Sequence, residues 1–299
     1  MIASEVLHDF WSSLNDFSLY KTNHTDHGIH SNYRYSFALP FERVDEPVLI
    51  TKFLQQNWAH TITISVIYFA IIKLIQSYLE HKKAFDLRLP LIFWNAFLAL
   101  FSIFGFIRFG EDLFYSLQHR TPYEWICYSC HPNDVAAFWS LLFAISKIFE
   151  LGDTLFIVLR KKPLIFLHYY HHAAVLIYTV HAGAEHTAAG RAFITMNYFA
   201  HSVMYFYYTL TAMGIKVPRK ISKWVTIIQT TQMLIGVMIS CCVLWIKQNT
   251  DWKCQQSRAN LSLAFLIYTT FLILFLHFYW STYIRHRSIK SESDKEKKL

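Results

Sequence analysis

Residues 89–109 read LPLIFWNAFLALFSIFGFIRF, a run of 21 residues whose only charged member, Arg108, stands next to its end. An α-helix needs about 20 mostly apolar residues to cross the hydrocarbon core of a bilayer. Stretches of similar length recur along the chain. We therefore predict an all-α integral membrane protein with seven transmembrane helices, at 58–79, 89–109, 135–159, 164–182, 191–214, 224–246 and 259–284. Polar residues interrupt the third, fourth and fifth spans, so hydropathy alone would understate them.

The composition of the whole chain agrees with this prediction. Of its 299 residues, 54% are hydrophobic and only 16% are charged. Ordinary globular proteins carry roughly 25% charged residues. The bias excludes a disordered, collagen-like or disulfide-scaffold protein, and it leaves too little polar surface for a soluble enzyme. All seven prolines fall outside the predicted helix interiors or at their edges.

Basic residues indicate the orientation in the membrane. The segments 80–88, 160–163, 215–223 and 285–299 carry 16 of the 28 Lys and Arg residues. Short loops rich in Lys and Arg face the cytosol. We therefore predict a lumenal N-terminal segment (1–57), a membrane domain (58–284) and a cytosolic basic tail (285–299). No cleavable signal peptide is recognisable, so the first span would serve as an anchor. A nucleic-acid partner is not indicated, because no basic module lies outside the spans.

Two short motifs fit this orientation. Asn23-His24-Thr25 is an N-glycosylation sequon on the predicted lumenal side. Lys295 and Lys297 are fifth and third from the C-terminus, a spacing that resembles the dilysine retrieval signal of endoplasmic-reticulum membrane proteins. Both motifs favour a protein of the endoplasmic-reticulum membrane.

The five cysteines divide by predicted depth. Cys241 and Cys242 lie inside the sixth span and are interpreted as small core residues. Cys127, Cys130 and Cys254 lie in loops on the oxidising side. A disulfide between Cys254 and either Cys127 or Cys130 is therefore predicted. A metal site at Cys127-Tyr-Ser-Cys130 is disfavoured, because no second Cys or His pair stands at matching spacing.

Four neighbouring spans contain polar residues that are expensive in a membrane and therefore mark function. The third span carries Lys147, Glu150 and Asp153 at steps of three, which places them on one helical face. The fourth span opens with three histidines that lie within about 100° of arc. The fifth and sixth spans add polar stripes. These residues are His168, His171, His172, then Asn197, His201, Met204, Tyr205, Tyr208, and finally Thr226, Gln229, Gln232.

Depth brings the four sets together. The third and fifth spans run toward the cytosol, and the fourth and sixth run back. At about 1.5 Å per residue, most of these side chains lie in the cytosolic half of the membrane, with His201 and Lys147 nearer the midplane. We therefore predict one buried polar site that opens to the cytosol.

Two alternative functions can be weighed against this pattern. A membrane di-iron desaturase or hydroxylase also uses His-x-x-His-His, but it needs about eight histidines for two octahedral metals. This chain has one such box, and beyond it only His201 lies inside a span at comparable depth. A seven-helix receptor typically carries mid-helix prolines and an Asn-Pro dipeptide near the last span, and neither is present. Both alternatives are disfavoured.

The four polar motifs resemble, in order and spacing, the signature boxes of the ELO family, the fatty-acid elongases of the endoplasmic reticulum. The quoted residues are Lys147-x-x-Glu150-x-x-Asp153-Thr154, His168-x-x-His171-His172, Asn197-x-x-x-His201-x-x-Met204-Tyr205-x-Tyr207-Tyr208 and Thr226-x-x-Gln229-x-x-Gln232. The runs 153–161 and 164–168 are most similar to the subgroup that acts on saturated and monounsaturated acyl-CoA. Tyr169 stands where many members of that subgroup have Trp.

The resemblance implies a 3-ketoacyl-CoA synthase, an acyltransferase that condenses malonyl-CoA with a long-chain acyl-CoA and releases CO₂ and CoA. It implies six helices forming a barrel around a narrow acyl tunnel, with the first helix outside. It implies no metal or other cofactor. The expected partners are membrane lipid, the ketoreductase, dehydratase and enoyl reductase of the elongation cycle, and a second copy in a homodimer.

The resemblance and the predicted depths of the side chains together suggest residue roles. His171, the middle histidine of its box, resembles the family's nucleophile, with His168, His172 and His201 within reach. His201 and Asn197 are expected to serve the malonyl half-reaction. Asp153 is expected to accept a hydrogen bond from a histidine ring. The remaining candidates are predicted to contribute to substrate binding, with the first two also forming a neutralising pair; they are Lys147, Glu150, Tyr205, Tyr208, Gln229 and Gln232.

Overall fold

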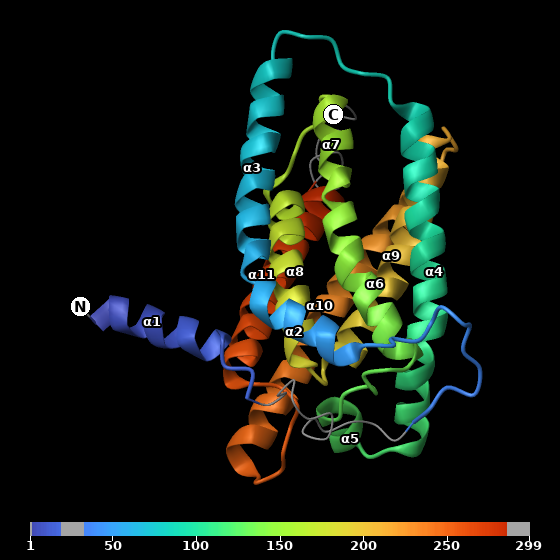
Figure 1. The fold of residues 1–299 in the computed structure, drawn as a ribbon. Coiled ribbons are helices and arrows are strands. Elements are labelled where there is room, and N and C mark those ends of the chain that lie inside the picture. Colours follow the sequence, from blue (N-terminus) through green and yellow to red (C-terminus); the bar gives the residue numbers. More distant parts are fainter. Residues whose placement is uncertain (1, 19–32, 286–299) are drawn as a thin grey trace, which may run out of the picture.

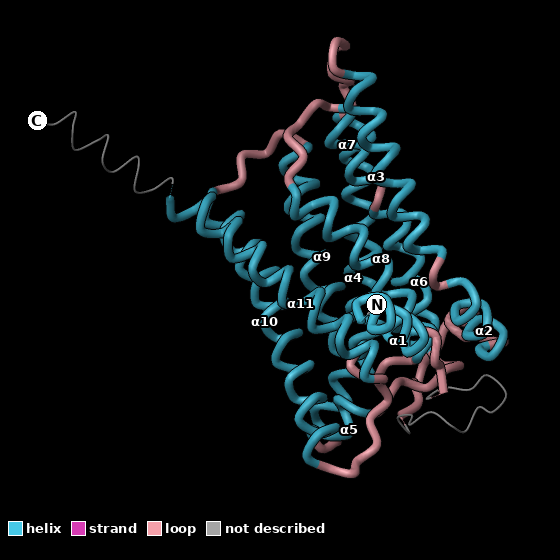
Figure 2. Tube along the Cα trace, turned by 90° about the vertical axis from the view of Figure 1, so that its left-hand side faces the viewer, coloured by secondary structure: helices cyan, strands magenta, loops and turns pink. Residues whose placement is uncertain are grey.

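The computed structural model describes residues 2–18 and 33–285, and every regular element in these ranges is helical. The long helices run side by side (Figures 1 and 2). They are α3 (His60–Leu79), α4 (Arg88–His119), α6 and α7 (Val135–Glu150 and Gly152–Leu159), α8 (Phe166–Glu185), α9 (Gly190–Ala212), α10 (Arg219–Asn249), and α11 with its π-helical extension η1 (Arg258–Tyr279 and Trp280–Arg285). Each predicted span therefore coincides with one of these helical rods.

In the part of the chain that is described, four helices are long and apolar enough to cross a membrane: α3, α4, α10 and α11 with η1. This confirms a helical membrane protein. The third, fourth and fifth rods are not apolar enough by this measure, and they contain three of the four polar motifs. Their polar residues need partners inside the protein, because lipid offers none.

Contacts between neighbouring helices form a closed circuit. α4 packs against α6 and α9, α8 against α6 and α11, and α10 against α9 and α11. α3 contacts α7 and α8 from outside this circuit. At one end, called the basic end, the rods are joined by loops 80–87, 160–165 and 213–218, drawn at the top of Figure 1. The opposite end is called the disulfide end.

Three short helices lie toward the disulfide end. α1 (Ile2–Leu14) projects sideways from the bundle, and α2 (Pro47–Asn57) crosses the rods. α5 (Pro122–Cys127) lies beside the lower end of α4 (Figure 1). The disulfide joins Cys127, at the end of α5, to Cys254 in the loop between α10 and α11. Cys127 is thus the partner between the two candidates left open by the sequence. Asn23, Lys295 and Lys297 lie outside the described residues.

Two predicted spans need correction. The third is not one helix, because α6 ends at Glu150 and α7 begins at Gly152. A Cβ atom on Gly152 would lie 2.8 Å from the Trp94 ring, so only glycine allows this close packing. The second is longer than predicted, since α4 continues to His119. Its polar extension is stabilised by the buried ion pair between Asp112 and Arg191 of α9.

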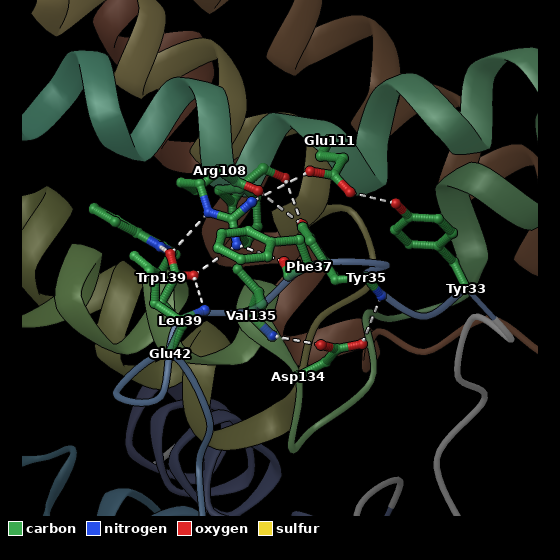
Figure 3. A network of polar contacts seen from close by, with 11 residues as sticks. Tyr33, Tyr35, Phe37, Leu39, Glu42, Arg108, Glu111, Asp134, Val135 and Trp139 are labelled. Atoms are coloured by element: carbon green, nitrogen blue, oxygen red, sulfur yellow. Dashed lines mark hydrogen bonds and ion pairs between the residues drawn. The ribbon is translucent and has the colours of Figure 1, made fainter.

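The segment before α2 is held to the bundle by a polar network that the sequence did not indicate (Figure 3). Glu42 is fully buried, and its carboxylate accepts hydrogen bonds from Arg108 of α4 (2.6 and 2.8 Å) and from Trp139 Nε1 of α6 (2.7 Å). These donors lower the pKa of Glu42 to about 2, with the Arg108 hydrogen bond as the largest cause. Residues 33–46 therefore form a strap across α4 and α6.

Candidate active site

Two cavities meet inside the helical circuit. The larger, of about 460 Å³, contains polar groups and extends toward the basic end, where Arg160 and Lys162 line it. We call it the polar cavity. The smaller, of about 130 Å³, is mostly apolar and extends toward α2 at the disulfide end. We call it the apolar cavity. Four residues line both cavities, namely His171, Asn197, Gln232 and Met233.

The fourth-span histidines occupy the first two turns of α8. His168 Nε2 lies 3.0 Å from Thr154 Oγ1, and Thr154 in turn shares a hydrogen bond with Tyr68 of α3. His172 is buried beside His168, with ring centroids 4.5 Å apart. His171 is different. Its ring packs on Phe271, and it makes no hydrogen bond to any residue in the described ranges. Of the three histidines, His171 is the one that lines both cavities, so its ring lies at their junction.

Asp153 is held by residues other than those the sequence suggested. Its Oδ1 accepts a hydrogen bond from Trp94 Nε1 (2.6 Å), and its Oδ2 accepts one from the Tyr205 hydroxyl (2.7 Å). The nearest histidine nitrogen, His172 Nε2, is 4.0 Å from Oδ2. That separation is too long for a hydrogen bond. The expected contact between Asp153 and a histidine ring is therefore absent from this arrangement, because the break at Gly152 turns Asp153 toward α4 and α9.

Lys147 and Glu150 form a buried pair that contacts Asn197 and His201. Lys147 Nζ lies 2.7 Å from Glu150 Oε1, and each side chain is only 3% exposed. The same ammonium donates to Asn197 Oδ1 at 2.9 Å. Glu150 Oε1 also lies 3.7 Å from His201 Nδ1. Neither Lys147 nor Glu150 lines either of these two cavities. The neutralising pair is present, and a role of the two residues in substrate binding stays a prediction.

Asn197 and His201 are coupled on α9. Asn197 Nδ2 lies 3.3 Å from His201 Nε2, one helical turn away. Both side chains line the polar cavity, and both are buried. Because Lys147 fixes the amide oxygen of Asn197, the amide nitrogen is oriented toward the His201 ring. A cation, an amide and an imidazole thus form a continuous chain that leads to the cavity wall.

Most of the other predicted residues meet at the same wall. Tyr205, Tyr208, Gln229 and Gln232 all line the polar cavity, as do Asp153, His168 and His172. Gln229 Nε2 contacts Met204 Sδ at 3.0 Å, which joins the motifs of α9 and α10. Tyr208 is 42% exposed and stands nearest to solvent in this group. The structure therefore brings together the polar motifs of four rods in one place, as the depth argument expected.

Several residues of the site were missed. Both Trp94 and Asn95 belong to α4. Trp94 donates a hydrogen bond to Asp153, and Asn95 lines the polar cavity. Asn95 is a buried polar residue in the run 89–109, so its type alone was a usable signal. Arg160 and Lys162 belong to a basic loop that the sequence assigned to the cytosolic side without placing either residue in the site, and both line the cavity. Among the described residues, no group of three His, Cys, Asp or Glu side chains converges as a metal-ligand set.

The apolar cavity ends against elements far from the motifs. Ile50, Thr51 and Leu54 of α2 line it, as do Gly183 of α8 and Gly190 of α9. Thr51 Oγ1 lies 2.7 Å from Nε2 of His186, the residue that follows α8. This contact ties α2 to the bundle. A Cβ atom on Gly190 would have no neighbour within 4 Å, so that glycine faces open space.

Comparisons with known proteins cover most of the chain. The sequence profile of the GNS1/SUR4 family, ELO, matches residues 53–291. The protein named putative fatty acid elongase 4 of Caenorhabditis elegans is 57% identical over 289 residues, which are 97% of this chain and 99% of that protein. Very long chain fatty acid elongase 6 of Drosophila melanogaster is 39% identical over 263 residues, or 86% and 82% of the two chains. The human protein of that name is 39% identical over 235 residues, or 78% and 88%.

Proposed function

The chain belongs to the ELO family, and on that premise we propose that this fatty acid elongase is the condensing enzyme of the elongation cycle, a 3-ketoacyl-CoA synthase. Its substrates would be a long-chain acyl-CoA, saturated or monounsaturated, and malonyl-CoA. The products would be a 3-ketoacyl-CoA longer by two carbons, CO₂ and CoA. The observation that carries this proposal is the position of His171, between an apolar cavity and a polar one.

The first half-reaction transfers the acyl group to the protein. A His171 ring nitrogen attacks the thioester carbonyl, the C–S bond breaks, and the imidazole proton leaves with CoA as its thiol. The acyl-histidine divides one difficult condensation into two easier steps. The acyl tail would occupy the apolar cavity, and the exclusion of water would protect the intermediate from hydrolysis.

The second half-reaction uses malonyl-CoA in the polar cavity. Loss of CO₂ leaves the electron pair on an enolate, whose carbon attacks the acyl carbonyl. The C–N bond to His171 then breaks, and the imidazole takes up a proton. Asn197 and His201 would stabilise the enolate oxygen, and the contacts of Lys147 with Asn197 and of Glu150 with His201 support this role. Gln229, Gln232 and Tyr205 would position the thioester. The reaction balances without a metal, an oxidant or another cofactor.

The setting of the enzyme is part of the proposal. The closed circuit of six rods would be a barrel around the acyl tunnel, with seven spans in total and α3 outside. The basic end would face the cytosol, so that Arg160 and Lys162 meet the phosphates of CoA. The enzyme would reside in the endoplasmic-reticulum membrane, with the N-terminus lumenal and the C-terminus cytosolic. There it would pass its product to the ketoreductase, dehydratase and enoyl reductase. It would act as a homodimer.

An assay of purified protein in lipid nanodiscs tests the reaction. Labelled malonyl-CoA is supplied with acyl-CoA primers of increasing length, and the product is identified by mass. We expect a 3-ketoacyl-CoA two carbons longer than the primer. If no primer gives a malonyl-dependent product, the proposed function is wrong.

Two variants test the assignment of the half-reactions. Intact-mass analysis after incubation with acyl-CoA alone should show an acyl adduct on the wild type and none on His171→Ala, which should also form no product. His201→Ala should still acquire the adduct but should lose turnover by about 100-fold or more, the range for removal of a donor to a developing oxyanion. Normal turnover of His171→Ala, or a His201→Ala variant that does not acylate, would contradict the division.

A further inference from the structure

The N-terminal helix α1 has one apolar face and one polar face. Val6, Leu7, Phe10 and Trp11 are spaced at i, i+1, i+4 and i+5, which places them on one side of a helix. All four are exposed, Val6 by 61% and Leu7 by 68%. The opposite side carries Glu5, His8, Asp9 and Ser12, which are exposed as well. The bundle therefore leaves a contiguous apolar stripe of α1 uncovered.

The C-terminal end of α1 is fixed to the bundle. Leu14 is buried, and its carbonyl oxygen lies 2.9 Å from His181 Nε2 of α8. Trp58 Nε1 donates to the side chain of Asn15 at 3.1 Å, and the Trp11 and Trp58 rings are 5.2 Å apart. These contacts hold the position of α1, so its direction is a property of the fold.

The anchor point lies where a membrane-spanning helix begins. Trp58 stands two residues before His60, the first residue of α3. α3 is apolar enough to span a membrane, and it exposes side chains such as Val66 and Leu74 on its outer surface. In Figure 1 α1 lies across the direction of α3, and in Figure 2 it is seen nearly along its own axis. The helix therefore extends outward from the bundle, along the surface of any bilayer that α3 crosses.

We propose that α1 is an interfacial helix that lies in the headgroup region of the same bilayer, with Val6, Leu7 and Phe10 inserted among the lipid acyl chains. An interfacial amphipathic helix binds more strongly as its buried apolar area grows, and the attachment of α1 to the bundle already holds it at the membrane surface. The exposed Trp11 would occupy the boundary at which indole rings concentrate, packed against the buried Trp58. α1 would thereby hold the depth of the disulfide end in the membrane.

A second copy of the chain is a poorer occupant for this face. Stable protein interfaces bury about 800 Å² on each partner, and four side chains on a 13-residue helix supply much less.

Site-specific fluorescence in nanodiscs tests the proposal. A genetically encoded, environment-sensitive fluorescent residue is placed at Leu7 or, as the matched control on the polar face, at His8. The full chain is then assembled with ordinary or brominated lipids. We expect blue-shifted emission at Leu7 that brominated lipids quench, and water-like, unquenched emission at His8. Equal emission at both positions would overturn the proposal. Blue-shifted emission at Leu7 without quenching would also overturn it, because the face would then be covered by protein.

Hydrogen exchange gives an independent readout. In nanodiscs, the triple variant Val6→Asp, Leu7→Asp, Phe10→Asp should lose backbone protection across α1 while α3 remains protected. The control Glu5→Gln, His8→Gln should retain protection in both helices. Unchanged protection of α1 in the triple variant would show that lipid contact does not hold it. Elongation activity enters neither readout, so the outcome is separate from that of the proposed reaction.

Discussion

His171 differs from its two neighbours in where it lies. His168 is fixed by Thr154 and lines only the polar cavity, as does His172, whereas His171 lines both cavities. At the residue scale, position relative to the cavities therefore separates the three histidines, and a His-x-x-His-His spacing does not contain that position. The same holds for Asp153, whose partners Trp94 and Tyr205 come from other helices.

The pair Lys147 and Glu150 should be structural, and a charge-removal series checks this. Lys147→Met should destabilise the protein by about 3–5 kcal/mol, because it leaves the buried Glu150 carboxylate without its cation. Adding Glu150→Gln should recover part of that loss. Melting temperatures in detergent and turnover are measured for both variants. If Lys147→Met is fully stable but inactive, the lysine acts on substrate and its supporting role is refuted.

At the scale of elements, α2 closes a cavity whose other end is built from the polar motifs. The family match begins at residue 53, so most of Pro47–Asn57 precedes it. Nevertheless, Ile50, Thr51 and Leu54 line the apolar cavity. A short helix before the first span thus contributes to the surface that an acyl tail would meet.

Filling the open space beside Gly190 should shorten the acyl chain that the enzyme accepts. Gly190→Leu adds a side chain where nothing lies within 4 Å, and overpacking against a full-length acyl tail costs about 1–3 kcal/mol. The kcat/KM for the longest accepted primer should therefore fall roughly tenfold or more, while short primers are unaffected. Phe53→Ala, on the exposed side of α2, serves as the control. A uniform loss across all primers would contradict a length-specific effect.

At the scale of the whole molecule, the N-terminal strap and the disulfide connect segments that are distant in sequence. Cys127 and Cys254 are 127 residues apart. Glu42 is joined to Arg108 and Trp139, so the strap contacts two rods of the circuit at once. These connections stabilise the disulfide end, where the rods are not held by the polar site.

The Glu42 network should make stability depend on pH in an acidic window. The pKa of Glu42 is lowered from 4.5 to about 2 in the folded protein. The carboxylate therefore stabilises the fold at pH above 4.5, and this contribution is lost as pH falls toward 2. Glu42→Gln should lower stability by about 3 kcal/mol near neutral pH and should flatten the decline below pH 4.5. Glu46→Gln, an exposed neighbour, is the control. Parallel melting curves for Glu42→Gln and wild type across this window would refute the assignment.

The sequence by itself determined the helical rods, their order and most of the residues that gather in the polar site. Hydrophobic length and helical periodicity are local properties, so runs such as 89–109 and the spacing from His168 to His172 carry them. Only the tertiary structure decided which partners those residues have. Each of these contacts joins segments that are far apart in the chain. The examples are the pairs Cys127–Cys254, Trp94–Asp153 and Glu42–Arg108, together with the position of α2 at the end of the apolar cavity. Such contacts depend on how the rods pack, and packing depends on side chains from several helices at once.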